Sequence, residues 1–166
     1  IRKISFDPHI DTMMPLFQLE IDPQPNLLPK DGVVYYYSNV LSRDISHYFF
    51  NKLLNNVEWD NDRIVMFGKI IVTKRKVAWY GDNPFSYTYS HSTKHALAWT
   101  PDLLDLKQIT ESITGETYNS CLLNLYHNGD EAMSWHADDE KELKKNGAIA
   151  SISLGADRFF EFKHKQ

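Results

Sequence analysis

The chain has 166 residues, of which 42% are hydrophobic and 24% charged, so it suits one globular domain with a sizeable core. Its formal net charge of −4 argues against a surface covered in phosphate contacts. A single cysteine excludes an internal disulfide framework, and no apolar run reaches membrane-spanning length. We therefore expect an intracellular, non-membrane protein, located in the cytoplasm if bacterial and in the nucleus if eukaryotic.

Aromatic residues stand out, with nine Tyr, nine Phe and four Trp. They favour a sheet-rich fold, and they are also the side chains on which nucleic-acid bases stack. Basic residues gather at Arg63, Lys69 and the run TKRK at 73–76. That run is compatible with a local nucleic-acid patch or with a solvated strand end.

The first half of the chain begins with a proline-rich stretch, residues 1–32, which we expect to be an extended arm. The run VVYYY at 33–37 predicts a strand. Ser42 can cap a following helix, with Asp44 in its first turn. The apolar stripe of this helix consists of Ile45, Phe49 and Leu53.

Residues 63–77 mix β-branched and basic side chains around MFGK and predict a hairpin, and a turn with a short strand follows. Thr100 and Pro101 predict the start of a helix, and Gly115 predicts its end. Beyond Gly115 the pattern predicts four strands, at 118–126, 132–138, 148–154 and 158–165. Helices followed by strands indicate an α+β fold, with helices against an antiparallel sheet or open barrel.

Side-chain alternation predicts a polar cluster in the stretch NLYHNGDEAMSWHADDE at 124–140. Asn124 and Tyr126 share one face of their strand, and Cys121, Leu123 and Leu125 form the opposite, apolar face. Asn128-Gly129 predicts a turn. On a returning strand, His136 and Asp138 would again share a face.

An imidazole and a carboxylate can supply two of the three protein ligands of a facial Fe(II) triad. Taken in isolation, the pair fits a surface hairpin tip with solvated charges better than a metal site. His91 and His95 have the spacing of a helical metal pair, but they lack the accompanying Glu of zinc proteases and fit a loop better.

The stretch 124–140, followed by IASISLGADRFFEFKHK, resembles the AlkB family of Fe(II)- and 2-oxoglutarate-dependent nucleic-acid dioxygenases. The closest likeness is to members that repair alkylated duplex DNA. It extends upstream through FGKIIVTKRKVAWYGD, SYTYS and ITGETYN, and so covers about residues 28–165. The resemblance implies a double-stranded β-helix (jelly-roll) core buttressed by helices.

By the same resemblance, His136 and Asp138 are the catalytic iron ligands, and Asn124 and Tyr126 bind 2-oxoglutarate. The residues implied in substrate binding are Phe67, Arg75, Tyr87, Tyr89, Asp139, Glu140 and Arg158. Tyr89 would stack on an extruded base, and Phe67 would fill the gap that the base leaves. Each has a structural alternative: hairpin packing for Phe67, cross-strand packing for the tyrosines, and a surface ion pair for Arg158.

The implied activity is oxidative dealkylation of bases such as 1-methyladenine and 3-methylcytosine in DNA. A ferryl species formed with O₂ hydroxylates the alkyl group, which leaves as an aldehyde, while 2-oxoglutarate is decarboxylated. The implied partner is alkylated DNA or RNA, bound by a monomer. Alternatives are an RNA or protein demethylase of the same class, and a non-enzymatic nucleic-acid-binding module.

The family's second histidine ligand and its 2-oxoglutarate-binding arginines lie well downstream of the His-x-Asp pair. His164, the only later histidine, matches a preceding strand instead, so the third ligand is expected beyond Gln166. We therefore predict an incomplete dioxygenase domain at 33–166, with nucleotide-recognition hairpins at about 60–95 and the last jelly-roll strands absent. The chain would then be either a fragment or a natural truncation with a weakened iron site.

Overall fold

The computed structural model describes residues 25–66, 68–89, 92–138 and 143–165, and for 64–66, 87–89 and 92–94 it describes the backbone alone. The chain divides into two compact units, Ile1–Ser42 and Arg43–Gln166. None of the helices in the described ranges is long and apolar enough to cross a membrane.

In the first unit, residues 25–42 form a loop organised by Asn26. Its Oδ1 accepts hydrogen bonds from the backbone N–H groups of Leu28 and Val34, and its Nδ2 donates to the Gly32 carbonyl. The strand predicted at 33–37 is wrong, because this segment has no regular structure. A tyrosine-rich run forms a strand only where another backbone pairs with it, and here Val34 has a single backbone bond, to Leu27.

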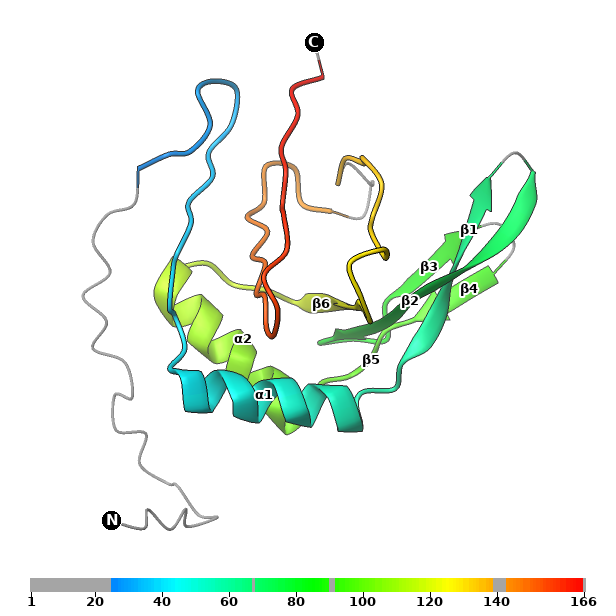
Figure 1. The fold of residues 1–166 in the computed structure, drawn as a ribbon, viewed down its shortest axis with the longest axis horizontal. Helices are drawn as coiled ribbons and strands as arrows, with labels where there is room; N and C mark the ends of the chain where they lie inside the picture. The colour runs from blue at the N-terminus through cyan, green and yellow to red at the C-terminus, as the bar shows by residue number, and fades with distance from the viewer. Residues whose placement is uncertain (1–24, 67, 90–91, 139–142, 166) are drawn as a thin grey trace. The chain divides into compact units, whose positions relative to one another are not determined.

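The second unit combines two helices with two sheets, in agreement with the predicted α+β class (Figure 1). The helices are α1 (Arg43–Asn56) and α2 (Pro101–Thr114). The strands are β1 (Asp60–Met66), β2 (Lys69–Gly81), β3 (Ser86–Tyr89), β4 (Ser92–His95), β5 (Leu97–Ala98) and β6 (Ser120–Leu125).

The long strand β2 organises the larger sheet. Val77 pairs with both Asp60 of β1 and Asn124 of β6, so these two strands lie on opposite edges of β2. The short parallel strand β5 pairs at the end of β2, where Tyr80 meets Leu97. The predicted hairpin is confirmed as β1 and β2, and a second hairpin, β3–β4, forms a separate two-stranded sheet.

The core lies between the helices and one face of β2 and β6. It contains Val57, Ala78, Tyr80, Leu103 and Leu123, and Cys121 packs against it. This arrangement confirms that Cys121 and Leu123 face inward, as the alternation predicted. Asn124, one residue further along the strand, therefore points to the opposite face.

Helix α2 follows its sequence signals closely. Thr100 adopts an extended conformation, and its side chain accepts a hydrogen bond from the Leu103 N–H at 3.3 Å. Pro101 opens the helix, and Gly115 closes it at φ 69°, a left-handed conformation that glycine adopts without steric cost. Helix α1 also forms, with Phe49 buried as its stripe predicted.

The strands predicted at 132–138, 148–154 and 158–165 are wrong. In the ranges that the structure describes, no helix or strand follows β6 (Figure 1). Alternation of apolar and polar side chains makes a segment compatible with a sheet. A strand forms only where a neighbouring backbone completes its hydrogen-bond ladder. The described strands accordingly form two open sheets and not a closed barrel.

Candidate functional site

The His136–Asp138 pair lies in a segment without regular secondary structure. The Nε2 atom of His136 is 3.3 Å from Oδ1 of Asp138, and both side chains are about half exposed, at 47% and 48%. The two side chains thus lie close together, although the returning strand on which they were predicted is absent. Two ligands at right angles, each about 2.1 Å from a metal ion, would stand about 3 Å apart.

The other ring nitrogen of His136 determines what this pair can bind. Nδ1 lies 2.9 Å from the Ser134 carbonyl oxygen, which can only accept, so Nδ1 carries the proton and donates. Nε2 of His136 therefore faces the Asp138 carboxylate, and the two groups can share either a proton or a metal ion. A ring held through its second nitrogen is the usual arrangement of metal-binding histidines.

These two residues fit the iron pair of a facial triad, but they do not complete it. Among the residues that the structure describes, no group of three His, Cys, Asp or Glu side chains could hold a metal ion. His95 ends strand β4, so the helical spacing of His91 and His95 is not realised, and His91 lies outside the described residues.

The side chain of Asn124 gives a second indication of a ligand-binding site. Its Oδ1 is buried, yet no described residue donates a hydrogen bond to it. An unpaired buried amide oxygen is costly, and such atoms commonly mark a place where a ligand or water binds. Rotation of the amide exchanges Oδ1 and Nδ2, so this group can offer either a donor or an acceptor to a cosubstrate.

Tyr126 follows strand β6 directly, at the start of the predicted turn. The turn is confirmed: the Asn128 side chain accepts a hydrogen bond from the Asp130 N–H at 2.9 Å. The described residues show no hydrogen bond or ion pair that joins Asn124 or Tyr126 to the His136–Asp138 pair. Among the described residues, the two halves of the predicted site are therefore not joined by a hydrogen bond or an ion pair.

Two residues that sequence reasoning missed hold this turn and the neighbouring hairpin. The first is Glu131, which is only 8% exposed and whose carboxylate accepts the His127 backbone N–H at 3.0 Å. That hydrogen bond, with the His127 ring and the charge of Lys74, lowers the pKa of Glu131 against the opposing effect of burial. The only sequence signal was an acidic residue four positions after a histidine, which is too common to be informative.

Asp62 is the other missed residue. The β1–β2 register shifts between Asn61 and Arg63, so Asp62 lies at a bulge, opposite residues 73–75. Its carboxylate pairs with Nη2 of Arg75. Bulges commonly redirect a side chain in this way.

Arg75 itself is only 6% exposed. Its Nε and Nη1 are buried, and no described residue accepts a hydrogen bond from them. Arg75 was expected at the rim of a nucleic-acid site, and here its guanidinium is buried beside Asp62 of strand β1. A buried cation with two unpaired donors is a strong hydrogen-bond donor toward any anion that reaches it.

The structure describes only part of the remaining predicted substrate-binding residues. In the backbone of the β3–β4 hairpin, Tyr87 pairs with Lys94 and Tyr89 with Ser92. Phe67, Asp139 and Glu140 lie outside the described residues.

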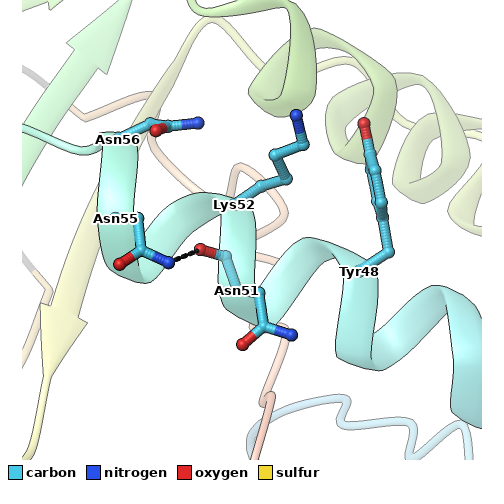
Figure 2. Close-up of a pocket in the computed structure, with 5 residues that line it drawn as sticks. All are labelled: Tyr48, Asn51, Lys52, Asn55 and Asn56. Carbon is cyan, nitrogen blue, oxygen red and sulfur yellow. Dashed lines mark hydrogen bonds between the residues drawn. The ribbon is translucent and has the colours of Figure 1, made fainter.

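A hollow of about 320 Å³ is lined by five residues of α1: Tyr48, Asn51, Lys52, Asn55 and Asn56 (Figure 2). None of them is a predicted site residue. Figure 2 shows Lys52 beside the ring of Tyr48, where its Nζ lies 5.4 Å from the ring centroid. The Tyr48 hydroxyl donates to Asp102 at 3.1 Å, so this residue links the two helices.

Comparison with known proteins identifies the class. The sequence profile of the 2OG-Fe(II) oxygenase superfamily matches residues 33–166. The chain is 35% identical over 138 residues to the human (Homo sapiens) protein named DNA oxidative demethylase ALKBH2, across 81% of this chain and 53% of that protein. It is 35% identical over 158 residues to the Bos taurus protein named alpha-ketoglutarate-dependent dioxygenase alkB homolog 3, across 86% of this chain and 54% of that protein.

A third relative, the Arabidopsis thaliana ALKBH2, is 32% identical over 123 residues, across 71% of this chain and 39% of that protein. The chain belongs to the 2OG-Fe(II) oxygenase superfamily and, within it, to the AlkB family. The sequence-based resemblance is thus confirmed at the level of the family. The chain spans about half the length of the human and bovine relatives.

Proposed function

We propose that this protein is an Fe(II)- and 2-oxoglutarate-dependent dioxygenase that removes alkyl groups from bases such as 1-methyladenine and 3-methylcytosine in DNA. The observation that carries the proposal is the His136–Asp138 pair, in which Nε2 of a ring held through its Nδ1 atom lies 3.3 Å from a carboxylate oxygen. The superfamily match and the names of the relatives support the same chemistry.

In this proposal, His136 and Asp138 are two of the three protein ligands of Fe(II). Asn124 and Tyr126 bind 2-oxoglutarate, and the unpaired Oδ1 of Asn124 supports this role. Bound Fe(II), 2-oxoglutarate and O₂ would supply the hydroxylation of the N-alkyl group, with succinate and CO₂ as co-products. The hydroxylated carbon then leaves the base nitrogen as an aldehyde.

The base must leave the DNA duplex to be reached. Extrusion costs a few kcal/mol, and least for a base whose pairing an alkyl group has already weakened. We propose that Tyr89, with Tyr87 beside it on β3, stacks on the extruded base and recovers about 1–3 kcal/mol. Phe67, Asp139, Glu140 and Arg75 complete the proposed substrate site.

Exposed cations support a nucleic-acid partner. Arg63, Lys69 and Lys74 are all exposed on the β1–β2 hairpin, which lies within the proposed recognition region at about 60–95. The proposal places these hairpins on a jelly-roll domain that includes residues 33–166, preceded by an arm at 1–32. It also assigns the protein to an intracellular compartment as a monomer.

The test is coupled turnover on an oligonucleotide that carries one 1-methyladenine. The full-length protein should consume 2-oxoglutarate and release formaldehyde in equal amounts, and His136→Ala should lose both. His47→Ala is the matched control, because His47 is exposed on α1 and belongs to no proposed site. If His136→Ala still consumed 2-oxoglutarate and released formaldehyde in equal amounts, the proposal would be wrong.

A second candidate is a nucleic-acid-binding module without turnover. It is favoured by one observation: among the described residues, no group of three His, Cys, Asp or Glu side chains could hold a metal ion. A module of this kind would bind DNA with strong salt dependence, and neither Fe(II) nor 2-oxoglutarate would change its affinity. Measuring the dissociation constant with and without both cofactors separates the two candidates.

A further inference from the structure

Within the part of the chain that the structure describes, Arg158 makes three polar or ring contacts, all with the turn that follows strand β6. Its Nη1 donates to the Asn128 carbonyl at 3.1 Å, and its Nη2 donates to the Glu131 carbonyl. Its guanidinium carbon lies 4.1 Å from the centroid of the Tyr126 ring. One side chain thus contacts the beginning, the middle and the end of residues 126–131.

The chemistry of arginine suits this geometry. The guanidinium is planar and presents several donors in a rigid fork, so its two ends can reach two different carbonyls while its face covers an aromatic ring. A cation over an aromatic ring is attracted to it, and the planar guanidinium of arginine can also stack on the ring, which a compact ammonium cannot. A lysine ammonium at the same place is a point charge and cannot make all three contacts.

Glu131 holds the same turn independently. Its buried carboxylate accepts the His127 backbone N–H, while its backbone carbonyl accepts from Arg158. The two side chains therefore secure different atoms of one short segment. Tyr126 stands at the start of that segment, and His136 follows five residues after its end.

We propose that Arg158 is a positioning residue that holds Tyr126 and its turn in the geometry required for 2-oxoglutarate. This inference rests on the proposed function, and it replaces the expected contact of Arg158 with nucleic acid. Both Nη atoms already donate to the protein's own backbone. Arg158 acts through Tyr126 and touches neither the iron nor the alkylated base.

The first experiment is amide hydrogen exchange on the full-length protein, which needs no ligand. Arg158→Ala loses two hydrogen bonds, so exchange at residues 126–131 should accelerate about tenfold, while exchange in α2 stays unchanged. Arg158→Lys should accelerate it similarly. Lys145→Ala is the matched control, because it removes one exposed cation outside the turn.

The second experiment separates positioning from nucleic-acid contact. In Arg158→Ala the KM for 2-oxoglutarate should rise about tenfold with a smaller change in kcat, and Arg158→Lys should not restore it. The salt dependence of DNA binding should match that of the wild type. If Arg158 instead binds a phosphate, the salt slope falls by about one and Arg158→Lys restores binding.

Unchanged exchange at 126–131 in Arg158→Ala would overturn the inference, and so would an unchanged KM. Failure of the wild-type protein to bind 2-oxoglutarate would be a different result. It would overturn the proposed function itself, and the inference about the cosubstrate with it, whereas normal wild-type binding with an unaffected Arg158→Ala overturns the inference alone.

Discussion

Replacing Asn124 by leucine should stabilise the protein and at the same time abolish the further stabilisation that 2-oxoglutarate binding provides. Oδ1 of Asn124 is buried without a donor among the described residues, and an unsatisfied buried acceptor costs about 1–3 kcal/mol. Because Asn124 as a whole is only half-buried, the lower end of that range applies. Leucine has nearly the same shape, lacks the polar atoms, and suits a strand better than asparagine.

A gain of about 1 kcal/mol in a chain of this length raises Tm by about 2–4 °C. Thermal unfolding followed by circular dichroism measures this shift. Adding Mn(II) and 2-oxoglutarate at about 100 times Kd should stabilise the wild type by about 2.7 kcal/mol. The same addition should leave Asn124→Leu nearly unchanged.

Asn61→Leu is the matched control, because it makes the same change of residue in another strand of the same sheet. Asn61 differs in that its Nδ2 donates to the Thr73 carbonyl at 2.9 Å. Losing that bond should lower Tm, so the two substitutions should have opposite signs. Equal destabilisation by both would refute the reasoning, and an unchanged ligand shift in Asn124→Leu would refute its role in binding.

Three further outcomes follow from the contacts. Asp62→Asn leaves the buried guanidinium of Arg75 without its counter-charge, and the free energy of unfolding in urea should fall by about 2–3 kcal/mol; a change below about 0.5 kcal/mol would contradict a buried ion pair. The Trp99 indole donates to Asp82 and lowers the pKa of this carboxylate below its ordinary value of 3.8. The ionised Asp82 carboxylate therefore contributes its full stabilisation above pH 3.8, and this stabilisation is lost as the pH falls through the lowered pKa. Urea titrations below about pH 4 should show that the wild type loses more stability than Asp82→Asn. Burial raises the pKa of Cys121 to about 11, so a thiol reagent at about pH 8 should label it slowly in the folded protein and rapidly in urea; fast labelling without urea would show that Cys121 is accessible.

Several features of the fold could be predicted because they depend on neighbours in sequence. The start of α2 at Thr100 and Pro101 and its end at Gly115 rest on hydrogen bonds within a single helical turn. The β1–β2 hairpin and the inward face of β6 at Cys121 and Leu123 follow from alternation along a strand. The contact between His136 and Asp138 is equally local, because the two residues are only two positions apart.

The predictions that failed concern partners far along the chain. Residues 33–37, 132–138, 148–154 and 158–165 have strand-like patterns but no strand. Alternation sets which side of a segment is apolar, whereas a strand also needs a second backbone at hydrogen-bonding distance. Whether such a second backbone is present depends on the tertiary fold and cannot be predicted from the residues of the segment itself.

The same distinction separates the parts of the candidate site. Family motifs and spacing in the sequence alone indicated Asn124, Tyr126, His136 and Asp138. The burial of Arg75 on Asp62 depends on a bulge between paired strands, and the contacts of Arg158 join residues about 30 positions apart. Burial and long-range hydrogen bonds arise only when distant segments meet, so the contacts of these residues became visible only in the folded chain.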